Sequence, residues 1–166
     1  MKKLFVIMFL FVAVNFFAQE IYTTQDSIVC SEKFELAAKD SLNKLPIGKV
    51  IEAIGKSFIG TPYVAHSLEK GETEQLVINL TGLDCTTFLE TVLTLSRCIK
   101  KNKTTFEDYK NELKFIRYRD GKLDGYPSRL HYTSDWILNN QKKGVVKSMG
   151  KEIGGILYNS KVFFMS

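Results

Sequence analysis

Apolar side chains recur every three to four positions in three stretches of this chain, which predicts helices over 47–59, 84–101 and 104–116. A proline stands before the first stretch and a Gly-x-Pro sequence follows it, as expected where a helix begins and ends. The second stretch is apolar on two adjoining stripes, so we expect it to be the central helix of the core. A shorter helix is predicted from Ser134 to Gly144.

Shorter apolar runs separated by turn residues predict strands. The run 76–80 is rich in β-branched residues, and the runs 145–146 and 162–165 have a similar character. Residues 20–33 are polar and are expected to form an extended leader, and 66–74 to form an exposed loop. This mixture of helices and strands in 166 residues indicates an α+β fold class and a single domain.

The range 1–19 has the pattern of a secretory signal peptide. Lys2 and Lys3 come first, Leu4–Val14 is uninterruptedly apolar, and small or polar residues follow before Glu20. The apolar run is shorter than the roughly 20 residues that a membrane span needs. We therefore expect an exported protein of the periplasm or cell envelope, with no stable membrane span after signal cleavage. An uncleaved anchor is the alternative.

The net charge and the number of metal-ligating residues limit which partners and cofactors the chain is expected to bind. Without Lys2 and Lys3 the 23 basic residues fall to 21, against 18 acidic ones, so the net charge is near +3. This mild excess is typical of solvated helix ends and indicates no nucleic-acid partner, whereas an anionic polymer of the envelope would suit it. Two histidines and three scattered cysteines have no metal-ligand spacing, so we expect no metal and no cofactor. We expect a monomer.

Of the three cysteines, Cys85 has the context of a nucleophile. It lies where a strand-like run gives way to a helical one, and the positive end of a helix dipole favours a thiolate. Asp84 can cap the same helix. Export would permit a disulfide between Cys30 and Cys98. A buried cysteine on a helix is more often a packing residue, however, and Cys98 fits that description.

A nucleophilic cysteine needs a histidine base and a further group that orients the histidine. The chain offers His66 and His131. His66 follows Tyr63 in a loop, and an exposed loop residue is the simpler interpretation. His131 lies in the segment 127–136, which is dense in polar, charged and aromatic side chains. From residue types alone, the roles of base, substrate contact and structural residue stay open for His131.

Five stretches of the sequence occur together in a characteristic order. They are 58–63, 77–80, 83–88, 116–119 and 128–136, with Gly-x-Pro-Tyr in the first and Asp-Cys-Thr-Thr-Phe in the third. This set resembles the NlpC-type papain-like cell-wall hydrolases, and within them the N-acetylmuramoyl-L-alanine amidase-like family.

The resemblance covers about residues 45–166 and implies three parts of the chain: a signal peptide (1–19), an N-terminal extension (20–44) and the N-terminal part of an amidase-like papain-fold domain (45–166). The fold implied is a nucleophile helix packed on an antiparallel sheet that is incomplete here. The activity implied is a cysteine amidase that cuts the amide between N-acetylmuramic acid and L-alanine in peptidoglycan fragments.

The resemblance also implies site residues. Cys85 matches the nucleophile, and Asp84 and Tyr63 match positions that line the substrate site in the wider superfamily. Arg129 and Tyr132 lie in the motif of this branch, so they are expected to bind the muropeptide substrate in a wall of the cleft.

One feature departs from the family pattern. The family's catalytic histidine lies on a later strand of Asp-x-Ser-His-Val-Gly character, and this chain has no such segment. The chain therefore resembles a C-terminally truncated member, and His131, which belongs to another motif, is only a possible base. The alternative function is a catalytically inactive remnant or a muropeptide-binding module. A generic papain-like peptidase or transglutaminase-like domain is a third hypothesis, and the 129–136 motif argues against it by resemblance.

Overall fold

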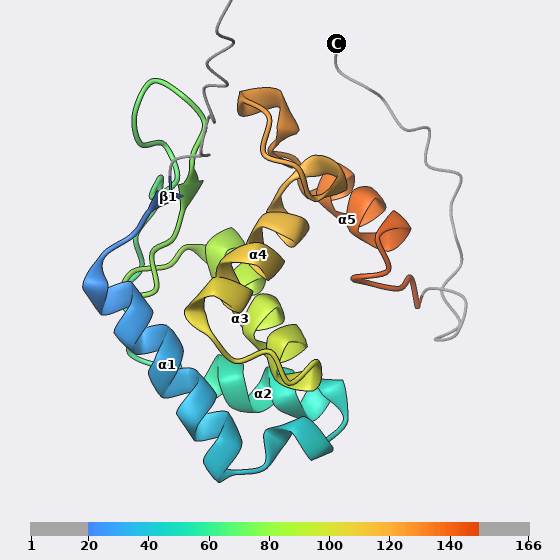
Figure 1. Cartoon of the computed structure of the whole chain (residues 1–166). Helices are drawn as coiled ribbons and strands as arrows, with labels where there is room; N and C mark the ends of the chain where they lie inside the picture. Colours follow the sequence, from blue (N-terminus) through green and yellow to red (C-terminus); the bar gives the residue numbers. More distant parts are fainter. Residues whose placement is uncertain (1–19, 150–166) are drawn as a thin grey trace, which may run out of the picture.

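The computed structural model describes residues 20–149 and is mostly helical in that part (Figure 1). The α-helices are α1 (Thr24–Lys39), α2 (Ile47–Lys56), α3 (Cys85–Lys100), α4 (Phe106–Arg117) and α5 (Thr133–Lys142). Strands β1 (Glu20–Ile21) and β2 (Leu76–Val77) pair in parallel, with Glu20 opposite Leu76 and Ile21 opposite Val77. Short 3₁₀ turns are η1 (Leu42–Lys44), η2 (Arg119–Gly121) and η3 (Tyr126–Ser128).

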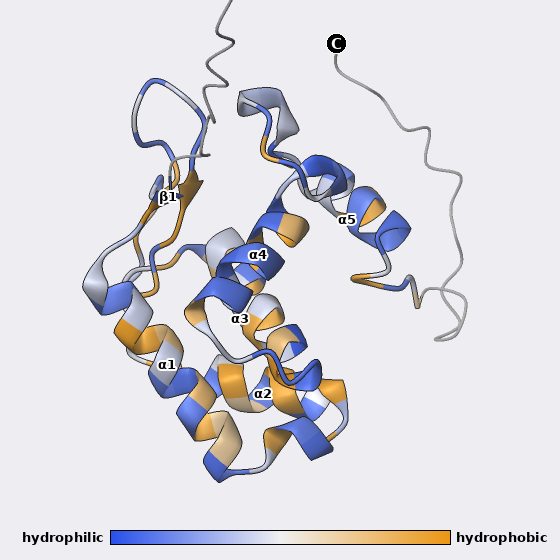
Figure 2. Ribbon diagram, in the orientation of Figure 1, coloured by the Kyte–Doolittle hydropathy of each residue, from blue (hydrophilic) through white to orange (hydrophobic). Residues whose placement is uncertain are grey.

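Helix α3 is the central element, because it packs against α1, α2 and α4 (Figure 1). Val92, Leu95 and Ile99 on α3 are buried in the main core, so the predicted central helix is confirmed. Phe88 and Leu89 of the same helix stay exposed near its beginning. Figure 2 shows apolar and polar residues interleaved along α1, α2 and α3, as expected for helices with one buried face.

The extended leader predicted for 20–33 is wrong beyond β1, because α1 begins at Thr24. Thr23 and Asp26 cap this helix reciprocally: the Thr23 amide donates to Asp26 Oδ2 (2.8 Å) and the Asp26 amide donates to Thr23 Oγ1 (3.2 Å). Asp26 Oδ1 also accepts from the backbone amide of Leu80 (2.7 Å), which fixes α1 against the segment after β2. The buried face of α1 consists of Asp26, Cys30, Phe34 and Ala37.

The sheet of residues 20–149 is two-stranded and parallel, and the antiparallel sheet that the resemblance implies remains a prediction. The strand predicted over 76–80 is limited to β2. The strand predicted over 145–146 is wrong, since both valines are irregular and pack against the small core cluster around Trp136. The predicted strand 162–165 and the predicted signal peptide 1–19 lie outside the described residues.

All three cysteines are free thiols, with Cys30 and Cys98 buried in the main core and Cys85 exposed. The packing role expected of Cys98 is therefore confirmed, and no disulfide joins it to Cys30 in the described structure. Burial raises the pKa of both core thiols, to about 12 for Cys98. Over 20–149, none of the helices combines the length and the apolar character needed to cross a membrane.

Candidate active site

Cys85 is the first residue of α3, and a reciprocal cap fixes its position. Asp84 Oδ1 accepts from the Thr87 amide (2.7 Å) and from the Thr87 hydroxyl (2.8 Å), while the Asp84 amide donates to Thr87 Oγ1 (2.8 Å). The predicted capping role of Asp84 is thus confirmed. Because the cap holds the first turn, the exposed Cys85 side chain lies at the positive end of the helix dipole.

Tyr63 is placed beside the cysteine by a parallel β-bridge to Leu83. The Val64 amide donates to the Leu83 carbonyl (3.2 Å), and the Leu83 amide donates to the Pro62 carbonyl (3.0 Å). The two segments and α3 enclose a cavity of about 250 Å³, which we call the cysteine cavity. It is lined by Phe58, Thr61, Tyr63, Leu83, Asp84, Cys85 and Phe88.

Gly82 packs directly against Val64 of the facing segment, and this gives a testable prediction. A Cβ atom at position 82 would lie 2.5 Å from Cγ2 of Val64. We expect Gly82→Ala to lower the free energy of unfolding by about 1–3 kcal/mol, because Val64 and the adjacent Tyr63 must move away. Urea unfolding measures the change. Gly48→Ala in α2, where an added Cβ meets nothing within 4 Å, is the control and should not destabilise. Equal stability of the two variants would contradict the prediction.

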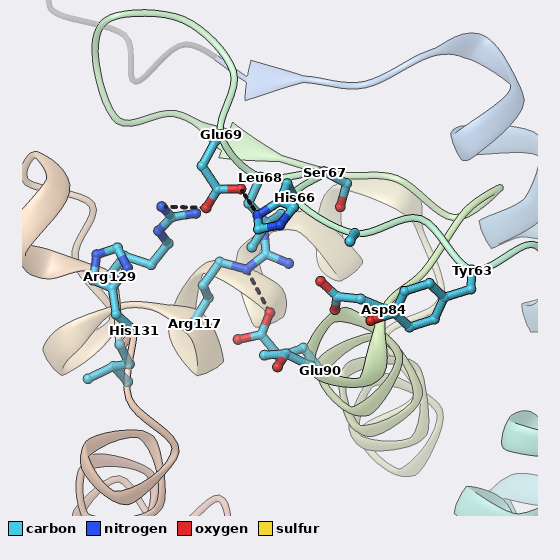
Figure 3. A pocket seen from close by; sticks show the side chains of 13 residues that line it. Tyr63, His66, Ser67, Leu68, Glu69, Asp84, Glu90, Arg117, Arg129 and His131 are labelled. Atoms are coloured by element: carbon cyan, nitrogen blue, oxygen red, sulfur yellow. Dashed lines mark hydrogen bonds and ion pairs between the residues drawn. The ribbon is translucent and has the colours of Figure 1, made fainter.

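A second cavity, of about 300 Å³, shares Tyr63 and Asp84 with the first and is much more polar (Figure 3). We call it the arginine cavity. Its titratable lining residues, other than Tyr63, are His66, Glu69, Asp84, Glu90, Arg117, Arg129 and His131. The loop after Tyr63, the first turns of α3, the end of α4 and the segment before α5 supply these side chains.

Arg117 and Glu90 form a buried ion pair in the wall of the arginine cavity. Arg117 Nε donates to Glu90 Oε2 at 2.7 Å, and the two side chains are only 4% and 3% exposed. The other oxygen of Glu90 accepts from the indole of Trp136 (3.2 Å), and Arg117 Nη1 donates to the Val77 carbonyl. Although burial disfavours its charge, the nearby Glu90 raises the pKa of Arg117. The pair and its hydrogen bonds therefore connect α3, α4, α5 and β2.

Arg129 is also buried, at 6% exposed, and it faces two carboxylates. Its Nε lies 3.4 Å from Glu74 Oε1, which accepts from the Tyr118 hydroxyl (2.8 Å), and its Nη2 donates to Glu69 Oε1 (3.3 Å). The backbone of Arg129 is held by an antiparallel bridge to Tyr118. The next amide, that of Leu130, donates to the carbonyl of the last residue of α4. Arg129 thus forms a rigid wall of the cavity.

Both histidines line the arginine cavity, but neither lines the cysteine cavity. His131 Nε2 lies 3.0 Å from the Tyr126 carbonyl, and the centroids of the His131 and Tyr126 rings are 4.1 Å apart. His66 has a positive φ of 56° and a side chain that is 91% exposed, with Nδ1 4.0 Å from Glu69 Oε2. The exposed-loop interpretation of His66 is therefore confirmed, although its place in the cavity wall was not predicted.

The structure brings most of the predicted site residues together. Those beside one or both cavities are Tyr63, Asp84, Cys85, Arg129 and His131. Tyr132, by contrast, is 69% exposed and lines neither of these two cavities. The substrate-binding roles and the base role remain predictions.

Sequence reasoning missed Ser67 and Glu69, because 66–74 was interpreted only as a solvated loop, and it missed the Glu90–Arg117 pair. One signal for Glu90 was present in the sequence. Glu90 lies three residues after Thr87 and four before Thr94, and this helical spacing places it on the buried face of α3. A carboxylate at such a position requires a buried partner. Among residues 20–149, no group of His, Cys, Asp and Glu has an arrangement suited to hold a metal ion.

The fold and the two adjoining cavities define a helical domain with a candidate hydrolase site at the start of its central helix. The chain belongs to the N-acetylmuramoyl-L-alanine amidase-like family, whose model matches residues 53–164.

Solved structures share this fold over part of their length. An N-acetylmuramoyl-L-alanine amidase from Bacteroides uniformis ATCC 8492 is 45% identical, with a TM-score of 0.56 over 59% of this chain and 41% of that chain. A Bacteroides fragilis protein described provisionally as a xylanase is 44% identical, with a TM-score of 0.56 over 60% of this chain and 43% of that chain. A Legionella pneumophila protein of the DUF1460 family is 30% identical, with a TM-score of 0.59 over 72% of this chain and 38% of that chain. The chain thus spans about two fifths of these proteins. No curated protein matches it.

Proposed function

We propose that this protein is an exported cell-wall amidase with a papain-like fold that uses Cys85 as its nucleophile. Its substrates are peptidoglycan fragments, and the bond cut is the amide between N-acetylmuramic acid and L-alanine. One observation carries the proposal: in a chain of this family, an exposed cysteine begins the central helix and shares a cavity with Asp84 and Tyr63. We further propose that it acts as a monomer in the periplasm or cell envelope.

The geometry supports acyl transfer in two steps. The Cys85 thiolate attacks the lactyl carbonyl, and the C–N bond breaks as the amine of the stem peptide leaves with a proton from the protonated base or from water. Water then hydrolyses the thioester to the lactyl carboxylate and the free Cys85 thiol. The Asp84 side chain accepts from the Thr87 amide, and the Asp84 backbone carbonyl accepts from the Phe88 amide. The first amides of a helix have no acceptor within it, so those of Cys85 and Thr86 can stabilise the oxyanion.

A second function is favoured by the surroundings of the thiol. The only polar side-chain contact of Cys85 Sγ in the described structure is Thr86 Oγ1 at 4.0 Å, and no histidine lines the cysteine cavity. A cysteine without a base would leave a muropeptide-binding module that does not hydrolyse its ligand. His131, which lines the adjoining cavity on the side away from Asp84 (Figure 3), is the possible base that the amidase proposal would test.

One incubation separates the two functions. The chain is mixed with a disaccharide-peptide of the cell wall, with xylan as a control polymer, and products are identified by mass spectrometry. The amidase proposal expects free stem peptide and intact disaccharide, and no products from xylan. Loss of release in a folded His131→Ala variant would assign His131 as the base. Binding without any release by the native chain would contradict the amidase and support the binding module.

A further inference from the structure

Ser67 and Arg129 present buried polar atoms to the arginine cavity that other described residues leave without a hydrogen bond. Ser67 is 5% exposed and Arg129 is 6% exposed, and both line this cavity. Ser67 Oγ makes no hydrogen bond, and Arg129 Nε, although 3.4 Å from Glu74, makes none of good geometry. Both atoms can donate, so a hydrogen-bond acceptor would satisfy each of them.

Glu69 already offers an acceptor of this kind. Its carboxylate accepts from Arg129 Nη2 at 3.3 Å and lies 4.0 Å from His66 Nδ1 (Figure 3). The two partners differ sharply in exposure, because the Glu69 side chain is 57% exposed and that of Arg129 is 6% exposed. An ion pair with one exposed partner on a surface loop is weak. Glu69 can therefore be exchanged for the carboxylate of a ligand at little cost.

The other carboxylates near this site are committed to partners within the fold. Glu90 is paired with Arg117, and Asp84 caps α3. Glu74 accepts from the Tyr118 hydroxyl, and its side chain is only 5% exposed. Glu69 is therefore the one carboxylate lining the cavity that is both exposed and placed on a buried guanidinium.

We propose that Arg129 and Ser67 form a carboxylate subsite in the arginine cavity, which adjoins the cavity of Cys85, and that an acidic peptide of the substrate displaces Glu69 from it. A guanidinium recognises a carboxylate with directional, charge-assisted hydrogen bonds, and Ser67 adds one more donor. The arginine cavity and the cysteine cavity share Tyr63 and Asp84, so a peptide bound at Cys85 extends past them to Arg129. The identity of the ligand, a muramoyl peptide with a free carboxylate, rests on the proposed function.

The test measures binding by calorimetry in the full chain carrying Cys85→Ala, which prevents turnover. The ligands are N-acetylmuramoyl-L-alanyl-D-glutamate and its diamide, which lacks both carboxylates. We expect the acid to bind about tenfold more tightly than the diamide. Glu69→Gln should tighten binding of the acid about two- to fivefold and leave the diamide unchanged. Glu72→Gln, an exposed residue of the same loop, makes the same charge change and should alter neither.

Ser67→Ala supplies a second variant that does not depend on the structural role of Arg129. It removes a buried hydroxyl that has no hydrogen bond, so the melting temperature should not fall. Binding of the acid should weaken about fivefold, with no change for the diamide. A purely structural Ser67 would leave both affinities unchanged.

Three results would overturn the subsite: equal affinity for acid and diamide, binding of neither ligand, or equal effects of Glu69→Gln and Glu72→Gln. These results are separable from the fate of the amidase proposal. A chain that releases no stem peptide but still prefers the acid, through Glu69 and Ser67, has the subsite without the activity. A chain that cleaves but binds acid and diamide equally has the activity without the subsite.

Discussion

Replacing Arg117 with methionine should lower the free energy of unfolding by about 3–5 kcal/mol. The Glu90 carboxylate would then lie almost fully buried with the Trp136 indole as its remaining side-chain partner among residues 20–149, and the Val77 carbonyl would lose a donor. An uncompensated buried charge is among the most destabilising changes that one substitution can make. Trp136 is the only tryptophan in the chain, so its fluorescence reports urea unfolding beside the altered pair.

Two variants show whether the unpaired charge is the cause. Glu90→Gln combined with Arg117→Met removes both charges and keeps an acceptor for Trp136, so it should recover about half of the lost stability. Arg119→Met breaks an ion pair with Asp135 whose side chains are 45% and 35% exposed, and it should cost less than about 1 kcal/mol. If Arg117→Met costs no more than Arg119→Met, the buried pair does not stabilise this wall of the cavity.

Local patterns were enough to predict three of the four helices that build the main core. The apolar spacing of α2, α3 and α4 is regular, and each of these helices buries part of the face that the spacing indicates, while Ile47 and Ile51 of α2 and Phe88 of α3 stay exposed. Helix α1 was missed because its polar residues outnumber a narrow buried face, and because the buried Asp26 looks like a surface residue in the sequence. Its carboxylate is buried by contacts with Leu80, 54 positions away, which no local pattern contains.

The candidate site also has a part that local sequence predicts and a part that it does not. Cys85 and its cap Asp84 are adjacent in sequence, so the start of α3 could be predicted from one short motif. The arginine cavity could not, because Arg117 lies 27 positions from Glu90, and Arg129 lies 60 positions from Glu69. Charge complementarity between such positions becomes visible only when the fold brings the loop after Tyr63 next to the segment before α5.

Cys85→Ala should lower the rate of stem-peptide release by at least about 10³-fold, because the acyl-enzyme cannot form without the thiolate. The variant should remain as stable as the native chain, since Cys85 is exposed and its only polar side-chain contact in the described residues is long. Release is measured by mass spectrometry of the products. Cys98→Ala, which alters a core thiol, is the opposite control: it should lose stability and keep the rate of the folded fraction.

Alkylation by iodoacetamide tests the same thiol without a substitution. At neutral pH the reagent should add once per chain, at Cys85, because burial shields Cys30 and Cys98 and raises the pKa of their thiols, to about 12 for Cys98. Loss of release should follow the fraction of Cys85 modified. Release that persists after complete modification would remove the cysteine from the mechanism. The titratable residues of the arginine cavity, among them His66, Glu69 and His131, would then be the candidates for moving the proton.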